Sequence, residues 1–142
     1  MTNIIILLGN LEDITKLDEL IKNPNSKKIC FDYQSHKILT QNGIECTFVE
    51  EYFDEKDQIL LDELTIQITT NWYKNKDIIR FLECHGINIG ELLEQELLLY
   101  FFSQIKKVIG VLKIIQKENP DKIITSSLSN FVSTINNKFE HI

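Results

Sequence analysis

The sequence predicts an α/β fold: a Rossmann-like three-layer sandwich around a parallel sheet with strand order 3-2-1-4. The chain opens with an unbroken apolar run at 4–8, which is typical of a central strand covered on both faces. Two shorter apolar segments follow and alternate with helical patterns, as in a βαβαβ unit. A long helical pattern then ends at Pro120, and a β-branched segment at 123–125 provides the fourth strand.

The first 49 residues contain three expected strands and two expected helices. Apolar residues bounded by turn-forming residues indicate the strands, and apolar residues at helical spacing indicate the helices. The strands are predicted at 3–8, 28–31 and 46–49, and the helices at 13–22 and 35–42. Because crossovers between parallel strands are right-handed and these connections are short, strands one and four are expected to be neighbours.

The connection from strand three to strand four is expected to be an extended helical crossover at 50–119. Helices are predicted at 54–70, at 77–84 and from 90 towards Pro120, with a final helix at 128–139. The pair Trp72-Tyr73 is expected to anchor one helix against another rather than stack on a sugar. The long helix should bury one face and be covered nearly all round at 97–102. That buried face is predicted to contain Leu98, Phe101, Phe102, Ile105, Val108, Ile109, Leu112 and Ile115, with Gly110 and the lysines opposite.

Composition limits the class of protein. The 142 residues suit a single domain at 1–142, and the net charge of −6 without a basic face argues against nucleic-acid binding. No window of about 18 residues in the long helix is free of charge, so no membrane span is expected. The first residues lack the basic region of a signal peptide, which predicts a cytoplasmic protein. Cys30, Cys46 and Cys84 do not form a disulfide framework and are expected to be buried free thiols.

The expected ligand site lies at the carboxyl edge of the sheet, where the chain reverses direction between strands one and four. Gly9 and Asn10 follow strand one, and Ser126, Ser127 and Asn130 follow strand four. Gly9 has two open interpretations: a ligand-facing loop, or a glycine needed only for the turn. The two serines could hydrogen-bond a sugar or phosphate, but capping the following helix is the simpler expectation.

Asp32 ends strand two, a position where nucleotide-binding proteins often hold a ribose, and it could instead cap the next helix. The glycine pattern of dinucleotide-binding proteins is absent after strand one, and no phosphate-binding P-loop exists, so no cofactor is predicted. The histidines lack the spacing of metal ligands, and no metal site is predicted. The catalytic residues stay unassigned.

The chain resembles the amino-terminal half of GT-B glycosyltransferases, closest to those of surface-polysaccharide and capsule synthesis. The resemblance is carried by the opening at 3–9, by Lys-Ile-Cys-Phe-Asp at 28–32, and by Glu-Asn-Pro-Asp-Lys-Ile-Ile at 118–124, which follows a long helix. It implies an acceptor-binding domain, with the nucleotide-sugar donor held mainly by a second, carboxy-terminal domain. The glycine-rich donor loop and glutamate motif of that second domain are absent from these residues, so catalysis is expected to require it.

Two other functions stay open at this stage. One is a stand-alone nucleotide- or sugar-binding α/β module, with its ligand between Gly9 and Ser126. The other is an interaction protein that forms a homodimer through the helices at 54–117.

Overall fold

The computed structural model describes residues 2–136. The chain divides into two compact units, which are described separately. The first unit comprises residues 1–54 and 110–142, and the second comprises residues 55–109. One helix, α7 (Glu94–Glu118), contributes its first part to the second unit and its last part, from Gly110, to the first.

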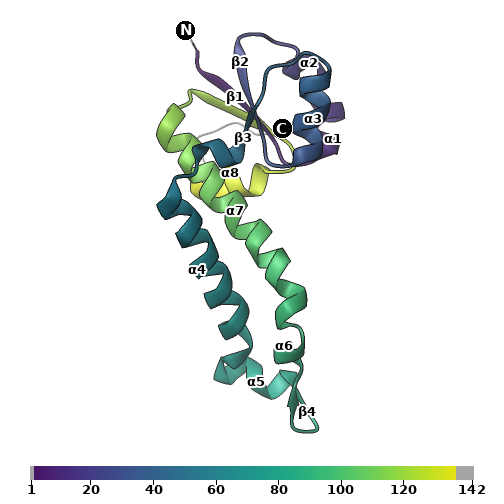
Figure 1. Ribbon diagram of the computed structural model, residues 1–142, viewed down its shortest axis with the longest axis vertical. Helices are drawn as coiled ribbons and strands as arrows, with labels where there is room; N and C mark the ends of the chain where they lie inside the picture. The colour runs from purple at the N-terminus through teal and green to yellow at the C-terminus, as the bar shows by residue number, and fades with distance from the viewer. Residues whose placement is uncertain (1, 137–142) are drawn as a thin grey trace. The chain divides into compact units, whose positions relative to one another are not determined.

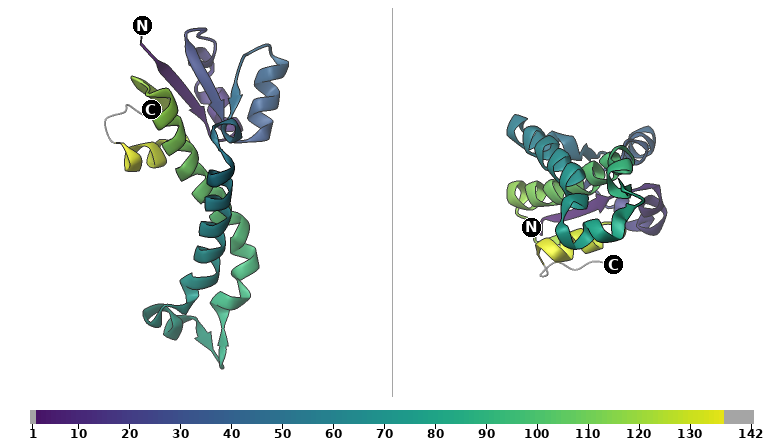
Figure 2. Two further views of the ribbon diagram at one scale, coloured as in Figure 1. Left: turned by 60° about the vertical axis from the view of Figure 1, so that its left-hand side comes forward. Right: turned by 90° about the horizontal axis from the view of Figure 1, so that it is seen from below.

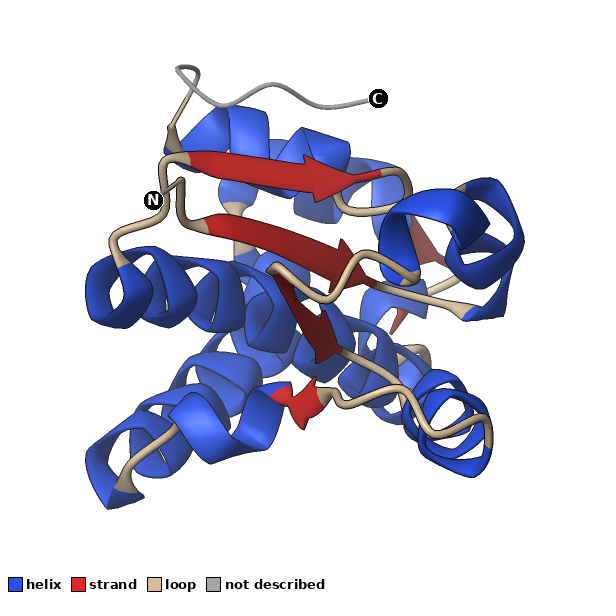
Figure 3. Ribbon diagram, turned by 90° about the horizontal axis from the view of Figure 1, so that it is seen from above, coloured by secondary structure: helices blue, strands red, loops and turns tan. Residues whose placement is uncertain are grey.

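The first unit is built on a four-stranded parallel sheet, which confirms the predicted α/β fold (Figure 3). Its strands are β1 (Ile4–Leu8), β2 (Ser26–Cys30), β3 (Thr47–Phe48) and β6 (Lys122–Thr125). The order β3-β2-β1-β6 is the predicted order 3-2-1-4, with β6 as the fourth strand of the sheet. In the register, Ile4 lies opposite both Ser26 and Lys122.

Helices cover both faces of this sheet, as the apolar opening run predicts. Ile6 and Leu8 pack towards α1 (Leu11–Lys16), α2 (Asp18–Ile21) and α3 (Tyr33–Gln41). Ile5 and Leu7, which alternate with them, pack towards the last part of α7 and α8 (Ser129–Ile135). All four side chains are fully buried, because successive residues of a strand point to opposite faces.

Several boundaries in the first unit differ from the prediction. The helix expected at 13–22 begins at Leu11, because Asn10 caps it, and it breaks at Leu17 into α1 and α2. The third strand has only two residues and continues into a 3₁₀ helix, η1 (Val49–Tyr52). The final helix ends at Ile135, and the expected buried position of its last turn, Phe139, lies outside the described residues.

The second unit consists mainly of helices (Figures 1 and 2). In chain order it contains α4 (Glu55–Asn71), η2 (Trp72–Lys74), α5 (Lys76–Leu82), a two-stranded hairpin of β4 (Glu83–Cys84) and β5 (Ile87–Asn88), α6 (Ile89–Leu92) and the first part of α7. The predicted end of the helix at 77–84 is wrong. The chain leaves the helix at Leu82 and forms an antiparallel turn through His85 and Gly86, both with positive φ.

The join between η2 and α7 in the second unit is held by close packing and hydrogen bonds. Tyr73 is buried, and its hydroxyl donates to Glu94 Oε2 at 2.6 Å. A Cβ atom on Gly90 would lie 2.2 Å from Tyr73 Cβ, so only glycine allows this approach. The expectation that the Trp72-Tyr73 pair anchors one helix against another is therefore confirmed for Tyr73.

The face that α7 buries in the first unit differs from the predicted one. Gly110, which was expected opposite the apolar face, is buried, and a Cβ atom there would lie 2.7 Å from Val49 Cγ2. Val111 and Ile114 are fully buried, whereas Leu112 is 38% exposed. Periodicity alone could not settle the face, because apolar residues at 111, 112, 114 and 115 fit two helix orientations.

The expectation that α7 is covered nearly all round at 97–102 is also wrong. Leu99 is 76% exposed and Tyr100 is 57% exposed, while Phe101 and Phe102 are half-buried. The second unit offers this stretch few other helices to pack against, so a large part of its apolar surface stays in contact with solvent.

No helix within residues 2–136 combines the length and the apolar character that crossing a bilayer requires.

Candidate functional site

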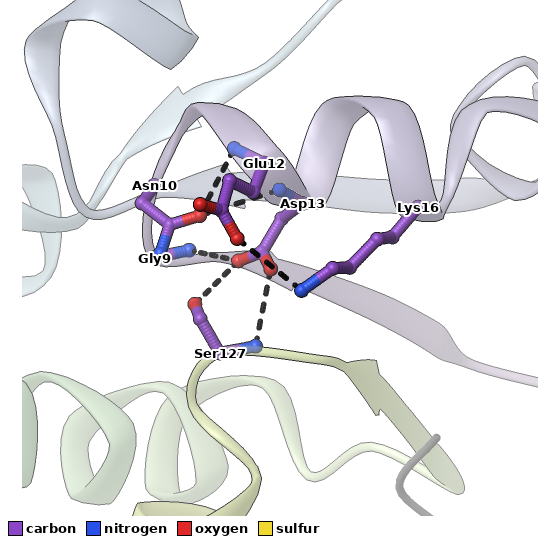
Figure 4. Close-up of polar contacts among 6 residues, drawn as sticks. All are labelled: Gly9, Asn10, Glu12, Asp13, Lys16 and Ser127. Atoms are coloured by element: carbon purple, nitrogen blue, oxygen red, sulfur yellow. Dashed lines mark hydrogen bonds and ion pairs between the residues drawn. The ribbon is translucent and has the colours of Figure 1, made fainter.

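The carboxyl edge of the sheet is organised by a buried carboxylate on α1, Asp13, which has no solvent-exposed surface (Figure 4). Its Oδ2 atom accepts hydrogen bonds from the Gly9 backbone N–H at 2.7 Å and the Ser127 hydroxyl at 2.5 Å. Its Oδ1 atom accepts a third bond from the Ser127 backbone N–H at 3.1 Å. One side chain therefore ties the loop after β1 to the loop after β6.

Gly9 lies so close to Ser127 that a side chain would not fit between the two loops. A Cβ atom at Gly9 would lie 2.3 Å from Ser127 Oγ and 2.9 Å from Leu128 Cγ. Such distances are shorter than van der Waals contact, so any larger residue would force the loops apart. The close approach in this structure is thus between two parts of the protein, and it accounts for the glycine without a ligand.

Asn10 is exposed and caps α1. Its side-chain Oδ1 accepts hydrogen bonds from the backbone N–H groups of Glu12 at 3.0 Å and Asp13 at 3.3 Å. These groups belong to the first turn of the helix, where backbone donors have no partner within the helix. The cap also orients the turn that carries Asp13 towards the sheet.

Asp32 caps the next helix, α3, as its alternative interpretation predicts. Its Oδ1 atom accepts a hydrogen bond from the Ser35 backbone N–H at 2.9 Å. Its Oδ2 atom is buried and finds no hydrogen-bond partner among residues 2–136. The hydroxyl of Ser35, a fully buried residue, likewise has no partner there. Buried polar atoms in proteins usually have a hydrogen-bond partner, which for these two oxygens can be a water molecule or a ligand.

The strand register brings Asp32 next to the loop that follows β1. Leu8 is paired with Cys30, and the Phe31 backbone N–H donates to the Leu8 carbonyl at 2.8 Å. Gly9-Asn10 and Phe31-Asp32 therefore leave the sheet side by side. The sequence placed these residues at one edge, and the structure confirms that proximity.

The residues after β6 that were predicted as ligand contacts or helix caps form other hydrogen bonds. Neither serine caps α8, which has no side-chain cap, so that expectation is wrong. The Ser127 hydroxyl instead donates to Asp13, and Thr125 Oγ1 accepts a long bond, 3.4 Å, from the Leu128 N–H. Ser126 is half-buried, and its carbonyl accepts from the Ser129 N–H. Asn130 is exposed on α8, and its carbonyl accepts from Thr134 Oγ1 at 2.7 Å.

Sequence reasoning missed Asp13, the residue that organises this edge. The available signal was an acidic residue in the first helical turn, four positions after the glycine that ends β1. That signal usually indicates only a favourable charge near a helix amino terminus. Its actual partner, Ser127, lies 114 positions away, and no local pattern indicates that pairing.

Cysteines and possible metal ligands do not form a site in the part of the chain that the structure describes. Within residues 2–136, no group of three or more His, Cys, Asp or Glu side chains could hold a metal ion. The three cysteines are free thiols, but only Cys30 is buried, whereas Cys46 is half-buried and Cys84 is exposed. The expectation of three buried thiols is therefore confirmed for Cys30 alone of these three; it is wrong for Cys84, which lies in the β4–β5 hairpin, and Cys46 is only half-buried.

The carboxyl edge thus holds two distinct groups of residues. Asp13, Gly9 and Ser127 bind one another and close the junction of β1 and β6. Asp32 and Ser35, beside the Gly9-Asn10 loop, have hydrogen-bonding capacity that the described residues leave unused. Searches against protein-family models, curated protein sequences and solved structures found no significant match to this chain.

Proposed function

We propose that the chain binds a sugar-containing ligand at the carboxyl edge of its sheet. In this proposal it is the acceptor-side domain of a nucleotide-sugar-dependent glycosyltransferase of surface-polysaccharide synthesis. The observation that carries the proposal is the buried Oδ2 atom of Asp32, which has no hydrogen-bond partner among the described residues.

A carboxylate oxygen accepts hydrogen bonds and cannot donate them, so its natural ligand partner is a hydroxyl or an N–H group. Leaving such a buried acceptor unpaired costs about 1–3 kcal/mol. Sugar rings carry several hydroxyl groups, and such a hydroxyl is a suitable donor to Asp32 Oδ2. An anion is less suited, because the charge of Asp32 would repel it.

The position of Asp32 agrees with where open parallel sheets hold their ligands. Such ligands bind outside the carboxyl ends of the strands, near the reversal in strand order. The hydroxyl of Ser127 already donates to Asp13, so the proposed contacts lie on the β1–β2 side of the reversal. Of the residues predicted from the sequence, Asn10 and Asp32 are the proposed ligand contacts.

The glycosyltransferase part of the proposal rests on the resemblance described above, supported by the order β3-β2-β1-β6 and the helical crossover before β6. In such enzymes the donor is held by a second domain, so we assign acceptor binding to this chain and no catalytic residue. Free thiols and a nucleotide-sugar substrate are both consistent with a cytoplasmic location, which belongs to the same proposal.

The direct test is an NMR titration of the ¹⁵N-labelled chain with the disaccharide cellobiose, with the donor UDP-glucose in a parallel series. We expect saturable shifts of the amides at 9–10 and 32–35 with the disaccharide and none with the donor. Asp32→Asn should abolish them while keeping the α3 cap, because asparagine also caps helices. Asp62→Asn, an exposed carboxylate on α4, is the matched control and should bind normally. Shifts that persist in a folded Asp32→Asn variant, or none in the wild type, would refute the proposal.

A second candidate function, homodimerisation through the helices at 54–117, is favoured by a different observation. The second unit exposes many large apolar side chains, far more than the scattered few that a surface usually carries. Those more than half exposed are Ile59, Ile66, Phe81, Ile87, Leu92, Leu99 and Tyr100. Light scattering should then give twice the chain mass, and Leu99→Lys should reduce it to that of a monomer. A monomer at every concentration would exclude this function.

A further inference from the structure

A cavity of about 800 Å³ lies at the opposite, amino edge of the sheet, in the first unit. The turn between α2 and β2 borders it on one side, and the loop between α3 and β3 borders it on the other. The starts of β1, β2 and β3 complete it. The residues with polar side chains that line it include Asn25, Ser26, Lys28, Glu45 and Thr47.

Lys28 is the unusual residue of this cavity, because it is a charged side chain that is only 6% exposed. It lies on β2 between Ser26 and Cys30, and these three alternate residues all point to the face covered by α1, α2 and α3. The Lys28 ammonium donates one hydrogen bond, at 2.6 Å, to the carbonyl of Asn23. An ammonium group carries three donors, so two remain without a partner among residues 2–136.

The neighbouring lysines have carboxylate partners, whereas Lys28 has none among residues 2–136. Lys22 Nζ pairs with Asp18 Oδ2 at 2.5 Å, and Lys27 Nζ pairs with Glu118 Oε1 at 2.6 Å. Burial lowers the pKa of Lys28, and the charge of Glu45 opposes that change only in part. Lys28 therefore places a buried positive charge at the cavity, and Glu45, which also lines the cavity, offsets that charge only in part. A buried charge without an ion-pair partner is costly unless something else supplies the opposite charge.

We infer that this cavity binds the oxyanion of a small molecule, a phosphate or carboxylate group, and that Lys28 is its principal contact. An oxyanion supplies both missing features: acceptors for the two remaining N–H groups and a compensating negative charge. A lysine ammonium acts as a point charge and suits either group. The inference does not depend on the proposed sugar site, because the two sites lie at opposite edges of the sheet and involve different residues.

The experiment is an NMR titration of the ¹⁵N-labelled chain at pH 7 with inorganic phosphate, with acetate in a parallel series. Ionic strength is held constant with sodium chloride, so that non-specific screening does not change. We expect saturable shifts confined to the amides at 22–28 and 43–47. A response to phosphate alone identifies phosphate as the bound group, and a response to both identifies a general oxyanion site. The absence of saturable shifts with either anion would overturn the inference.

Two variants separate the role of Lys28 from a general effect of positive charge. Lys28→Met should weaken anion binding about tenfold or more, because a hydrogen bond between charged groups is lost. Lys37→Met removes an exposed lysine of α3 that does not line the cavity, and it should leave binding unchanged. Equal affinity in the wild type and Lys28→Met would overturn the inference.

A further measurement covers the case in which Lys28→Met does not fold. The ¹⁵Nζ and ¹³Cε resonances of Lys28 are followed against pH in the wild-type chain, with and without phosphate. A bound anion favours the charged ammonium, so phosphate should raise the apparent pKa of Lys28. A titration of Lys28 that phosphate does not change would overturn the inference on its own.

Discussion

Asp13 and Ser127 lie 114 positions apart in the chain and are joined by two hydrogen bonds, one to the Ser127 hydroxyl and one to its backbone N–H. Because Asp13 also accepts from the Gly9 N–H, a single carboxylate fixes the two loops that meet where β1 and β6 are neighbours. This junction determines the shape of the carboxyl edge.

Asp13→Ala should destabilise the chain by about 3 kcal/mol, because it removes a fully buried carboxylate that accepts three part-buried hydrogen bonds from Gly9 and Ser127. Urea denaturation followed by circular dichroism measures the change. Glu12→Ala is the matched control, since that neighbouring carboxylate is exposed and, within the described residues, forms an ion pair with Lys16 alone, across one helical turn. We expect the control to change stability by about 0.5 kcal/mol or less. A loss below about 1 kcal/mol for Asp13→Ala would show that the junction is not energetically important.

Gly9→Ala should cost about 1–3 kcal/mol, because its Cβ atom would lie 2.3 Å from Ser127 Oγ. Removing that hydroxyl with Ser127→Ala relieves the shorter contact but leaves Leu128 Cγ at 2.9 Å. The double variant should therefore be more stable than the sum of the two single changes predicts, as a double-mutant cycle can measure. Strict additivity would mean that the two residues do not contact each other in this way.

Gly110→Ala tests the face that α7 presents to the sheet. An alanine in a helix is normally more stable than a glycine by about 1 kcal/mol. Here its Cβ atom would lie 2.7 Å from Val49 Cγ2 and 2.8 Å from Phe31 Cε1, so we expect a net loss of about 1–2 kcal/mol. Val49→Ala should partly restore stability in the double variant. A stabilising Gly110→Ala would indicate that Gly110 faces solvent, as the sequence predicted.

The pH dependence of stability should report on Glu118, which accepts hydrogen bonds from Lys27 and the Tyr52 hydroxyl. Burial of Glu118 alone would raise its pKa, but these hydrogen bonds outweigh burial and place the pKa below the ordinary value of 4.5. The stabilisation that ionised Glu118 gives the folded chain is therefore fully present above pH 4.5. It is lost as the pH falls through the folded-state pKa.

The pKa of Lys27 shifts in the opposite direction. Burial alone would lower its pKa, but hydrogen bonds to Glu118 and Tyr52 raise it above the ordinary value of 10.5. The stabilisation is therefore present below pH 10.5 and is lost as the pH rises through the folded-state pKa. Glu118→Gln should cost about 1 kcal/mol near pH 7, since the pair is partly solvent-exposed, and the cost should shrink in acid. A cost that is the same at pH 3 and pH 7 would contradict this account.

Most of the fold could be predicted from the sequence, because strands and helices leave local patterns. The apolar runs at 4–8 and 123–125 indicated buried strands, and the short connections led to the order 3-2-1-4. The hairpin at 83–88 could not be predicted in this way, because strands of two residues are too short for a recognisable alternation. The buried face of α7 was ambiguous for a related reason: its apolar residues fit two orientations.

The sequence by itself determined the sheet, its order and the edge at which Asn10 and Asp32 lie side by side. Only the tertiary structure decided which polar groups satisfy one another there: Asp13 pairs with Ser127 and Gly9, and Asp32 Oδ2 finds no partner in the described part of the chain. It also decided that Lys28 is buried at the other edge, with no carboxylate partner among residues 2–136. The physical reason is the sequence separation over which each kind of information holds. Periodicity records how a residue relates to its near neighbours, whereas hydrogen-bond partners more than 100 positions apart depend on register and packing.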